Sequence, residues 1–201
     1  MKIFLKLGSY LFHPLLMPIM GASIYYYITP RYLEKELVTA NLFALAIVTV
    51  TIPIVLFFLL KNLGQVQSIY LKSVEERKFP LMLQCVLLLL IIKVVFNPYD
   101  NPELYYFFIG IIFSTFAALI MVIFKVKVSL HQMGVAGVLM FLVGLSAHFK
   151  VNLLVSISFF LFANGWVASS RLQEKAHTYI ELALGLLVGA LPQVILYNMW
   201  L

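Results

Sequence analysis

Long uncharged stretches of apolar residues alternate with short polar segments along the whole chain. A helix needs roughly 20 mostly apolar residues to cross the hydrocarbon core of a bilayer. Stretches of this kind predict seven spans, at residues 9–29, 38–60, 79–98, 104–124, 131–148, 151–169 and 179–200. They are continuously apolar, whereas the strands of a transmembrane barrel alternate over about ten residues. The pattern therefore predicts an all-α polytopic transmembrane helix bundle, of six or seven spans because Lys93 interrupts the third stretch.

The composition agrees with this fold class and excludes a soluble domain. Hydrophobic residues make up 63% of the 201 residues, charged residues make up 11%, and the mean hydropathy is +1.02. The single cysteine, Cys85, excludes a disulfide within the chain and a cysteine-cluster metal site. Since no internal repeat or long linker divides the chain, residues 1–201 are predicted to form one integral membrane domain.

The net charge of +6 reports on topology, because the basic residues are scattered and form no stripe that would bind nucleic acid. If every stretch crosses the bilayer, one face carries ten basic residues: Lys2, Lys6, Lys61, Lys72, Arg77, Lys78, Lys125, Lys127, Arg171 and Lys175. The other face carries three, namely Arg31, Lys35 and Lys150. By the positive-inside rule, the first face is cytoplasmic. We expect a multi-pass protein of the cell membrane, and the compact chain favours a bacterial inner membrane.

Polar residues gather in three segments, at residues 70–80, 127–131 and 169–181. Two predicted spans separate each segment from the next, so all three return to the same face of the membrane. Polar groups are costly to keep beside lipid, and their positions are therefore strong pointers to function in a membrane protein. The arrangement predicts one pocket that contains four of these residues, Arg77, His131, Arg171 and His177.

His177 and Glu181 stand four residues apart at the start of the last predicted span, which places them on one face of a helix. The carboxylate can accept the Nδ1 proton of the imidazole, which leaves Nε2 unprotonated and nucleophilic. Arg171 offers a planar guanidinium that suits phosphate oxygens. His131 begins another predicted span beside Ser129 and can protonate a leaving oxygen. Together these residues indicate covalent catalysis at a phosphate group.

The segment Ser170-Arg171, five residues, His177, three residues, Glu181 resembles the third signature of the type 2 phosphatidic acid phosphatase superfamily, S-R-x5-H-x3-D. Ser129-Leu130-His131 is similar to a reduced form of the second signature, P-S-G-H. Arg77, followed by Pro80, lies where the first signature, K-x6-R-P, is expected. The resemblance covers about half of the chain, from residue 70 to residue 181.

This resemblance implies roles for seven residues. His177 would be the nucleophile that forms a phosphohistidine, Glu181 would orient it, and His131 would protonate the leaving alcohol. The phosphoryl oxygens would be held by four residues, Arg77, Arg171, Lys72 and Ser129. Such a mechanism needs no metal ion and no other cofactor.

The chain departs from the family pattern at three positions. Tyr70 replaces the lysine expected seven residues before Arg77, and the nearest upstream lysine, Lys72, is only five residues before it. Glu181 replaces the usual aspartate and is one methylene longer. Leu130 replaces the glycine before the second histidine, which removes a backbone position that could approach phosphate closely.

The predicted function is an integral membrane lipid-phosphate phosphatase, which hydrolyses a phosphomonoester or a diphosphate of a membrane lipid. Two alternatives remain open, a non-catalytic membrane protein of the same fold and a small transporter. A transporter would place charges at mid-membrane, where Lys93 is the one candidate. The remaining histidines have simpler interpretations: His13 would form a hydrogen bond between packed helices, and His148 would lie at the membrane interface opposite the site.

Overall fold

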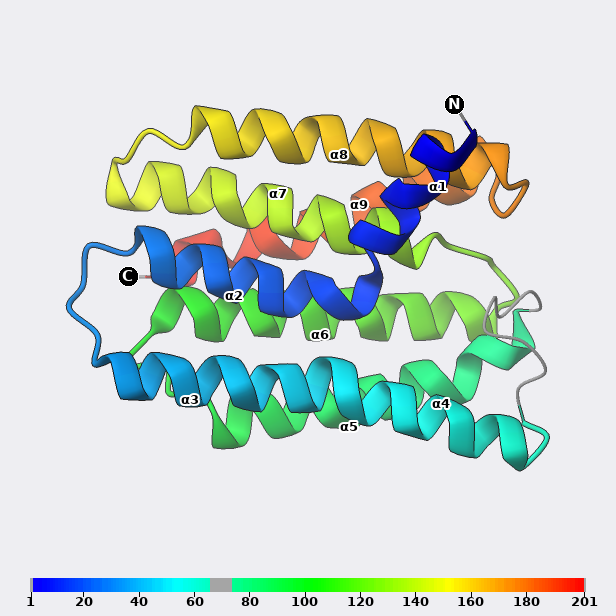
Figure 1. The fold of residues 1–201 in the computed structure, drawn as a ribbon, viewed down its shortest axis with the longest axis horizontal. Helices are drawn as coiled ribbons and strands as arrows, with labels where there is room; N and C mark the ends of the chain where they lie inside the picture. Colours follow the sequence, from blue (N-terminus) through cyan, green and yellow to red (C-terminus); the bar gives the residue numbers. More distant parts are fainter. Residues whose placement is uncertain (1, 66–73, 201) are drawn as a thin grey trace.

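The computed structural model describes residues 2–65 and 74–200, and most of its helices run along one long axis (Figure 1). The α-helices are α1 (Lys2–Leu11), α2 (Met17–Ile28), α3 (Lys35–Ala46), α4 (Ile52–Asn62), α5 (Lys78–Val94), α6 (Pro102–Ile123), α7 (Leu130–Phe149), α8 (Leu154–Gln173) and α9 (Tyr179–Leu196). Short 3-10 or π turns complete them at η1 (Pro14–Leu16), η2 (Ile47–Thr51), η3 (Glu75–Arg77) and η4 (Tyr197–Met199). The described residues contain no β-strand, so the predicted all-α class is confirmed.

Four helices are long and apolar enough to cross a membrane: Lys35–Asn62, Pro102–Ile123, Leu130–Phe149 and Tyr179–Met199. The count rises to five if Ile3–Leu11 and Pro14–Ile28 form one broken span. Among the remaining helices, α5 is 17 residues long, and α8 carries Asn164 and Arg171 within its 20 residues. The structure therefore has the apolar helices expected of a membrane protein, but the predicted six or seven spans are not confirmed.

The first predicted span, at residues 9–29, is not one straight helix. The chain bends by 42° between α1 and the helix that begins at Pro14. A residue before proline avoids the helical conformation, and His13 accordingly has an extended backbone with φ −66° and ψ 138°. The Nδ1 atom of His13 accepts a hydrogen bond from the backbone N–H of Leu15 at 3.3 Å, which caps the new helix. The bend turns the His13 ring toward α7, against His131.

A second proline is accommodated without a break. Pro53 lacks an N–H and would crowd the carbonyl four residues earlier. The preceding residues of η2 widen into a π-helix, so α3, η2 and α4 stay continuous as Lys35–Asn62. This keeps η2 beside η1 and α4 beside α5, where α4 side chains line an interior cavity.

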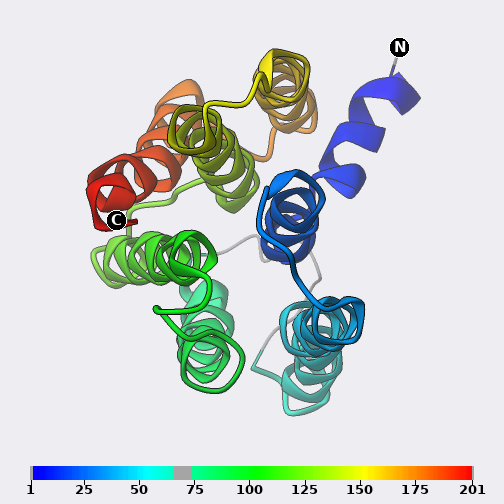
Figure 2. The same ribbon diagram turned by 90° about the vertical axis from the view of Figure 1, so that its left-hand side faces the viewer.

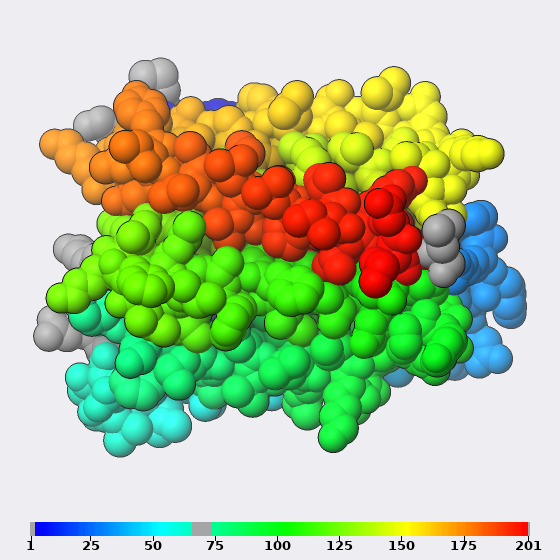
Figure 3. All heavy atoms as spheres, turned by 180° about the vertical axis from the view of Figure 1, so that it is seen from behind, coloured from blue at the N-terminus to red at the C-terminus, as the bar shows by residue number. Residues whose placement is uncertain are grey.

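Close packing of α9 against α7 positions the polar end of the bundle. Figure 2 shows α9 beside α7 and α6, and the rear view in Figure 3 shows it between α8 and α6. A Cβ atom on Gly189 would lie 2.0 Å from the carbonyl oxygen of Met133, and one on Gly185 would lie 2.6 Å from that of Ser129. The two glycines let the helix backbones meet, and the N–H of Ser129 donates to the carbonyl of Glu181 at 3.1 Å. The segment that precedes α7 and the first turn of α9 are thereby held together.

A buried ionic cluster ties the helices together at the opposite end. The carboxylate of Glu103, at the start of α6, is 0% exposed. It accepts hydrogen bonds from the Arg31 guanidinium at 2.7 Å and the Tyr25 hydroxyl at 3.1 Å, and it lies 3.1 Å from Nε2 of His148. The simple interfacial interpretation of His148 is therefore incomplete, because its ring contacts a fully buried carboxylate.

Candidate active site

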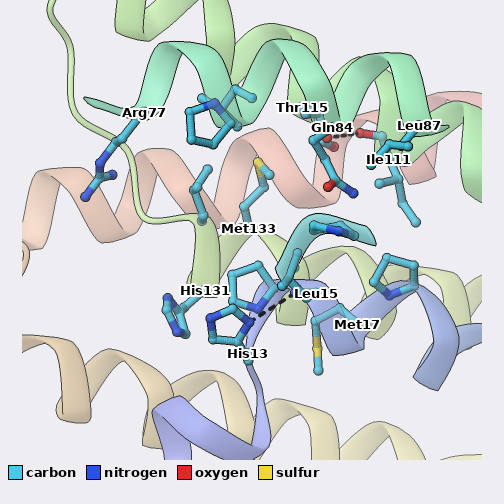
Figure 4. Close-up of a pocket in the computed structure, with 18 of the residues that line it drawn as sticks. His13, Leu15, Met17, Arg77, Gln84, Leu87, Ile111, Thr115, His131 and Met133 are labelled. Carbon is cyan, nitrogen blue, oxygen red and sulfur yellow. Dashed lines mark hydrogen bonds between the residues drawn. The ribbon is translucent and has the colours of Figure 1, made fainter. Parts of the chain in front are cut away.

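Four residues predicted to share a pocket line one cavity of about 460 Å³: Arg77, His131, Arg171 and His177. They come from η3, α7, α8 and the segment before α9, which all meet at the right-hand end of the bundle in Figure 1. His13 lines the same cavity. Figure 4 shows Arg77, His131 and His13 gathered toward one end of it, with Leu87 and Ile111 toward the other.

The His177–Glu181 pair forms at the first turn of α9. The hydroxyl of Thr178 accepts a hydrogen bond from the N–H of Glu181 and so caps the helix. His177 precedes this cap, and its Nδ1 lies 2.6 Å from Oε2 of Glu181. The ammonium of Lys127 is 3.8 Å from the same oxygen and donates to the Ala176 carbonyl at 2.7 Å. A neutral His177 with its proton on Nδ1 leaves the Nε2 lone pair available.

The surroundings of His177 favour its neutral form. Burial lowers the pKa of the His177 imidazole to about 4, and the positive charges of Arg77 and Lys127 act in the same direction. The hydrogen bond to Glu181 opposes the shift. His177 is therefore uncharged near neutral pH, as a nitrogen nucleophile must be.

This pKa predicts a pH-dependent stability difference between the wild type and His177→Gln. An unfolded histidine titrates near pH 6.5 and the folded one near 4, so the unfolded chain binds more protons between these values. Wild-type stability should therefore rise with pH from about 4 to 6.5, by roughly 3 kcal/mol relative to the variant. Thermal unfolding in detergent at closely spaced pH values measures the difference. Parallel curves for the two proteins would contradict the assignment.

A buried arginine, Arg77, and a half-buried one, Arg171, make this end of the cavity positive. Arg77 is 6% exposed, and its guanidinium donates to the Val128 carbonyl at 2.9 Å. Arg171 donates to the Glu174 carboxylate at 2.7 Å and to the Ser9 hydroxyl at 3.4 Å. The Nε atom of Arg171 is buried and has no hydrogen-bond partner among the described residues. Guanidinium groups held in this way suit an anion with several oxygens, such as phosphate.

His131 lies in the first turn of α7. The backbone of Ser9 and the side chains of Arg171, His13 and His177 lie near its ring. The rings of His131 and His13 meet edge to face, with centroids 5.3 Å apart. The interpretation of His13 as a helix-packing residue missed its place in the cavity. The one signal for it in the sequence is a histidine within an apolar stretch, next to a proline that bends the helix.

Of the other three predicted site residues, two do not line the cavity and one lies outside the described residues. Ser129 is fully buried and does not line the cavity, because its hydroxyl accepts a hydrogen bond from the Gln132 N–H and caps α7. The Ser129 hydroxyl is therefore not in position to hold a phosphate in the cavity. Glu181 acts on the cavity through His177 and is not part of the lining. Lys72 lies outside the described residues.

The rest of the cavity is mostly apolar and runs into the helix bundle. Its walls come from η1, α2, α4, α5, α6, α7 and α9, with side chains such as Met17, Phe57, Leu81, Leu87, Phe107 and Val138. Ile54 and Phe58 of α4 contribute to the lining and are also exposed at the surface. The cavity therefore joins a polar, positively charged end to an apolar interior.

In the part of the chain that the structure describes, no three His, Cys, Asp or Glu residues come close enough to hold a metal ion. Comparison of the chain with family models, with curated proteins and with solved structures finds no match.

Proposed function

We propose that this chain is an integral membrane lipid-phosphate phosphatase, a divergent relative of the type 2 phosphatidic acid phosphatases, that works through a phosphohistidine. The observation that carries the proposal is the His177–Glu181 hydrogen bond of 2.6 Å beside a cavity shared with Arg77, Arg171 and His131. An oriented imidazole, two phosphate-binding cations and a second imidazole are the groups that such a reaction requires.

In the first step, Nε2 of His177 attacks the phosphorus atom of the lipid phosphate. A bond forms between nitrogen and phosphorus, and the bond from phosphorus to the lipid oxygen breaks. His131, as an imidazolium, gives its proton to that oxygen and releases the lipid alcohol. In the second step, a water molecule attacks phosphorus, the bond to His177 breaks, and His131 takes the proton of the water. The products are the lipid alcohol and inorganic phosphate, or a lipid monophosphate and phosphate from a diphosphate.

The charges near His177 support this course. Arg77 and Arg171 would bind the phosphoryl oxygens and offset the negative charge that spreads over them during transfer. A bound phosphate dianion would also favour the imidazolium form of His131, because an opposite charge nearby favours the charged form of an imidazole. Glu181 would stabilise the positive charge that develops on His177 as its bond to phosphorus forms.

The apolar part of the cavity suits the chain of a membrane lipid. Ile54 and Phe58 place part of the lining on the outer surface of α4, which favours lateral access from the bilayer. The helices α1 and α2 would together form one membrane span, and α3 and α4 would form a second. Each of α5 to α9 would form a span of its own, giving seven spans. The distribution of Lys and Arg then puts the phosphate site at the cytoplasmic face.

The direct test is phosphate release by the purified protein in detergent containing a chelator. Lipid monophosphates and diphosphates of several classes should be compared, and we expect at least one to be hydrolysed without divalent metal. With lipid labelled at the transferred phosphorus, acid-labile label should appear on the protein during turnover. If no lipid phosphate is hydrolysed, a non-catalytic or transporting role replaces this proposal.

A further inference from the structure

His13 lies in the cavity beside the proposed phosphate site, although it belongs to none of the three polar segments that predicted this site. It stands at the bend before Pro14, where its extended backbone leaves the direction of α1. Its ring meets the ring of His131 edge to face, with centroids 5.3 Å apart, and Arg171 is also a neighbour. A third imidazole, besides those of His131 and His177, is therefore present at the polar end of the cavity.

The hydrogen bond that caps η1 decides which ring nitrogen of His13 carries a proton. Nδ1 accepts from the backbone N–H of Leu15 at 3.3 Å, so a neutral ring holds its proton on Nε2. A protonated ring carries a proton on Nε2 as well. Nε2 is consequently a hydrogen-bond donor in either charge state, and it cannot act as a base while the cap is in place.

This donor lies on the side of the ring away from the cap. Figure 4 shows the bond to Leu15 on one side of the His13 ring and His131 on the other. No hydrogen bond joins Nε2 of His13 to another of the described residues. The side chain is only partly buried and lines the cavity, so a molecule bound there can reach it.

The groups around His13 favour an anion as the acceptor. Arg77 and Arg171 line the same end of the cavity, and its lining includes no Asp or Glu. Each guanidinium already gives one donor to the protein, Arg77 to the Val128 carbonyl at 2.9 Å and Arg171 to the Glu174 carboxylate at 2.7 Å. A neutral N–H beside them would add a bond to a phosphate without adding another full charge to the helix bundle.

We propose that His13 is a further phosphate-binding residue, whose Nε2–H donates to a non-bridging oxygen of the phosphate held by Arg77 and Arg171. Its neighbour His131 keeps the separate task of proton transfer to the leaving oxygen. The inference rests on the proposed function, since it assumes that the substrate phosphate binds at this end of the cavity. It adds to the site a residue from the bend between α1 and α2, outside the segments that carry the other groups.

The test compares two variants of residue 13 that separate this donor from the helix cap. His13→Asn keeps the cap, because asparagine is among the best N-cap residues, but its short side chain offers no donor at the place of Nε2. His13→Gln does the reverse, because its amide N–H reaches about as far as Nε2 and glutamine is not a favoured N-cap. The probe is octyl phosphonate, which resembles a phosphate ester and is not hydrolysed. Its affinity for each protein is measured by calorimetry in detergent containing a chelator.

We expect His13→Asn to bind octyl phosphonate about tenfold more weakly than the wild type, because it loses one hydrogen bond to a charged acceptor. It should unfold at nearly the wild-type temperature. His13→Gln should bind clearly more tightly than His13→Asn and should unfold at a lower temperature. A role in helix capping alone predicts the opposite order of affinities, with His13→Asn close to the wild type.

Wild-type affinity in His13→Asn would overturn the inference, as would a His13→Gln protein that binds no better than His13→Asn. Absence of binding to the wild type would overturn it too. Phosphate release from lipid phosphates by the wild type, measured separately, tests the phosphatase itself, so hydrolysis would leave the proposed function intact in each of these cases. If His13→Asn does not fold, His13→Ser takes its place, because serine is also a good N-cap and does not reach as far as Nε2. Wild-type affinity in that variant would count equally against the inference.

Discussion

Replacement of His177 by alanine should abolish phosphate release, lowering kcat/KM by roughly 10⁴-fold or more. The variant lacks the nitrogen that would form the covalent intermediate, and no other described residue provides a base already oriented by a carboxylate at 2.6 Å. The measurement is steady-state phosphate release in detergent, on the lipid phosphate that the wild type hydrolyses fastest. Labelled phosphate should also fail to attach to the variant.

The control is Tyr179→Ala, a change two residues away at a side chain that is 78% exposed. Tyr179→Ala should retain wild-type turnover, and both variants should unfold at nearly the wild-type temperature near neutral pH. Turnover within tenfold of wild type in His177→Ala would exclude the phosphohistidine mechanism. Loss of activity in Tyr179→Ala as well would instead indicate damage to the first turn of α9.

Replacement of Glu103 by alanine should destabilise the folded protein by about 3 kcal/mol. The change removes the carboxylate shared by Arg31, Tyr25 and His148, and it leaves the buried Tyr25 hydroxyl and the His148 ring without that partner. Arg31 is partly exposed and can return to water, which keeps the loss below that of a fully buried ion pair. Unfolding in detergent, followed by circular dichroism, measures the effect.

Two further variants identify the origin of this loss. Glu34→Ala removes an exposed carboxylate near the same end of the bundle, one without a side-chain capping bond, and should change stability by no more than about 0.5 kcal/mol. Glu103→Gln keeps the shape and should fall between the wild type and Glu103→Ala. A Glu103→Ala protein as stable as Glu34→Ala would show that the cluster contributes nothing.

Local features of the chain made the helices and one part of the site predictable. Each helix forms over a continuous apolar stretch, and within a helix the backbone hydrogen bonds are satisfied by residues of the same stretch. The place of a helix along the chain therefore depends on nearby residues. The contact between His177 and Glu181 follows from their four-residue spacing at a helix start. The placement of Arg77, His131 and Arg171 at one end could be expected because an even number of helices separates the segments that carry them.

Contacts between distant parts of the chain were not predictable in this way. The bend at Pro14 brings His13 to His131, and the capping of α7 turns the Ser129 hydroxyl away from the cavity. The partners of Glu103 come from three other helices or turns, and Gln193 takes its orientation from Phe107, 86 residues away. Such contacts depend on how helices pack against one another, and one sequence carries no local signal of that packing.

The sequence by itself determined the all-α class, the approximate positions of the helices and the residues that we propose to act on a phosphate. These properties follow from hydrophobicity, backbone hydrogen bonding and residue spacing, which act over short distances along the chain. Only the tertiary structure decided that the polar end opens into a mostly apolar cavity and that His13 lies there beside His131. That outcome requires glycines to let α7 and α9 meet, a proline to bend the first helix, and side chains from six or more elements to leave a space unfilled.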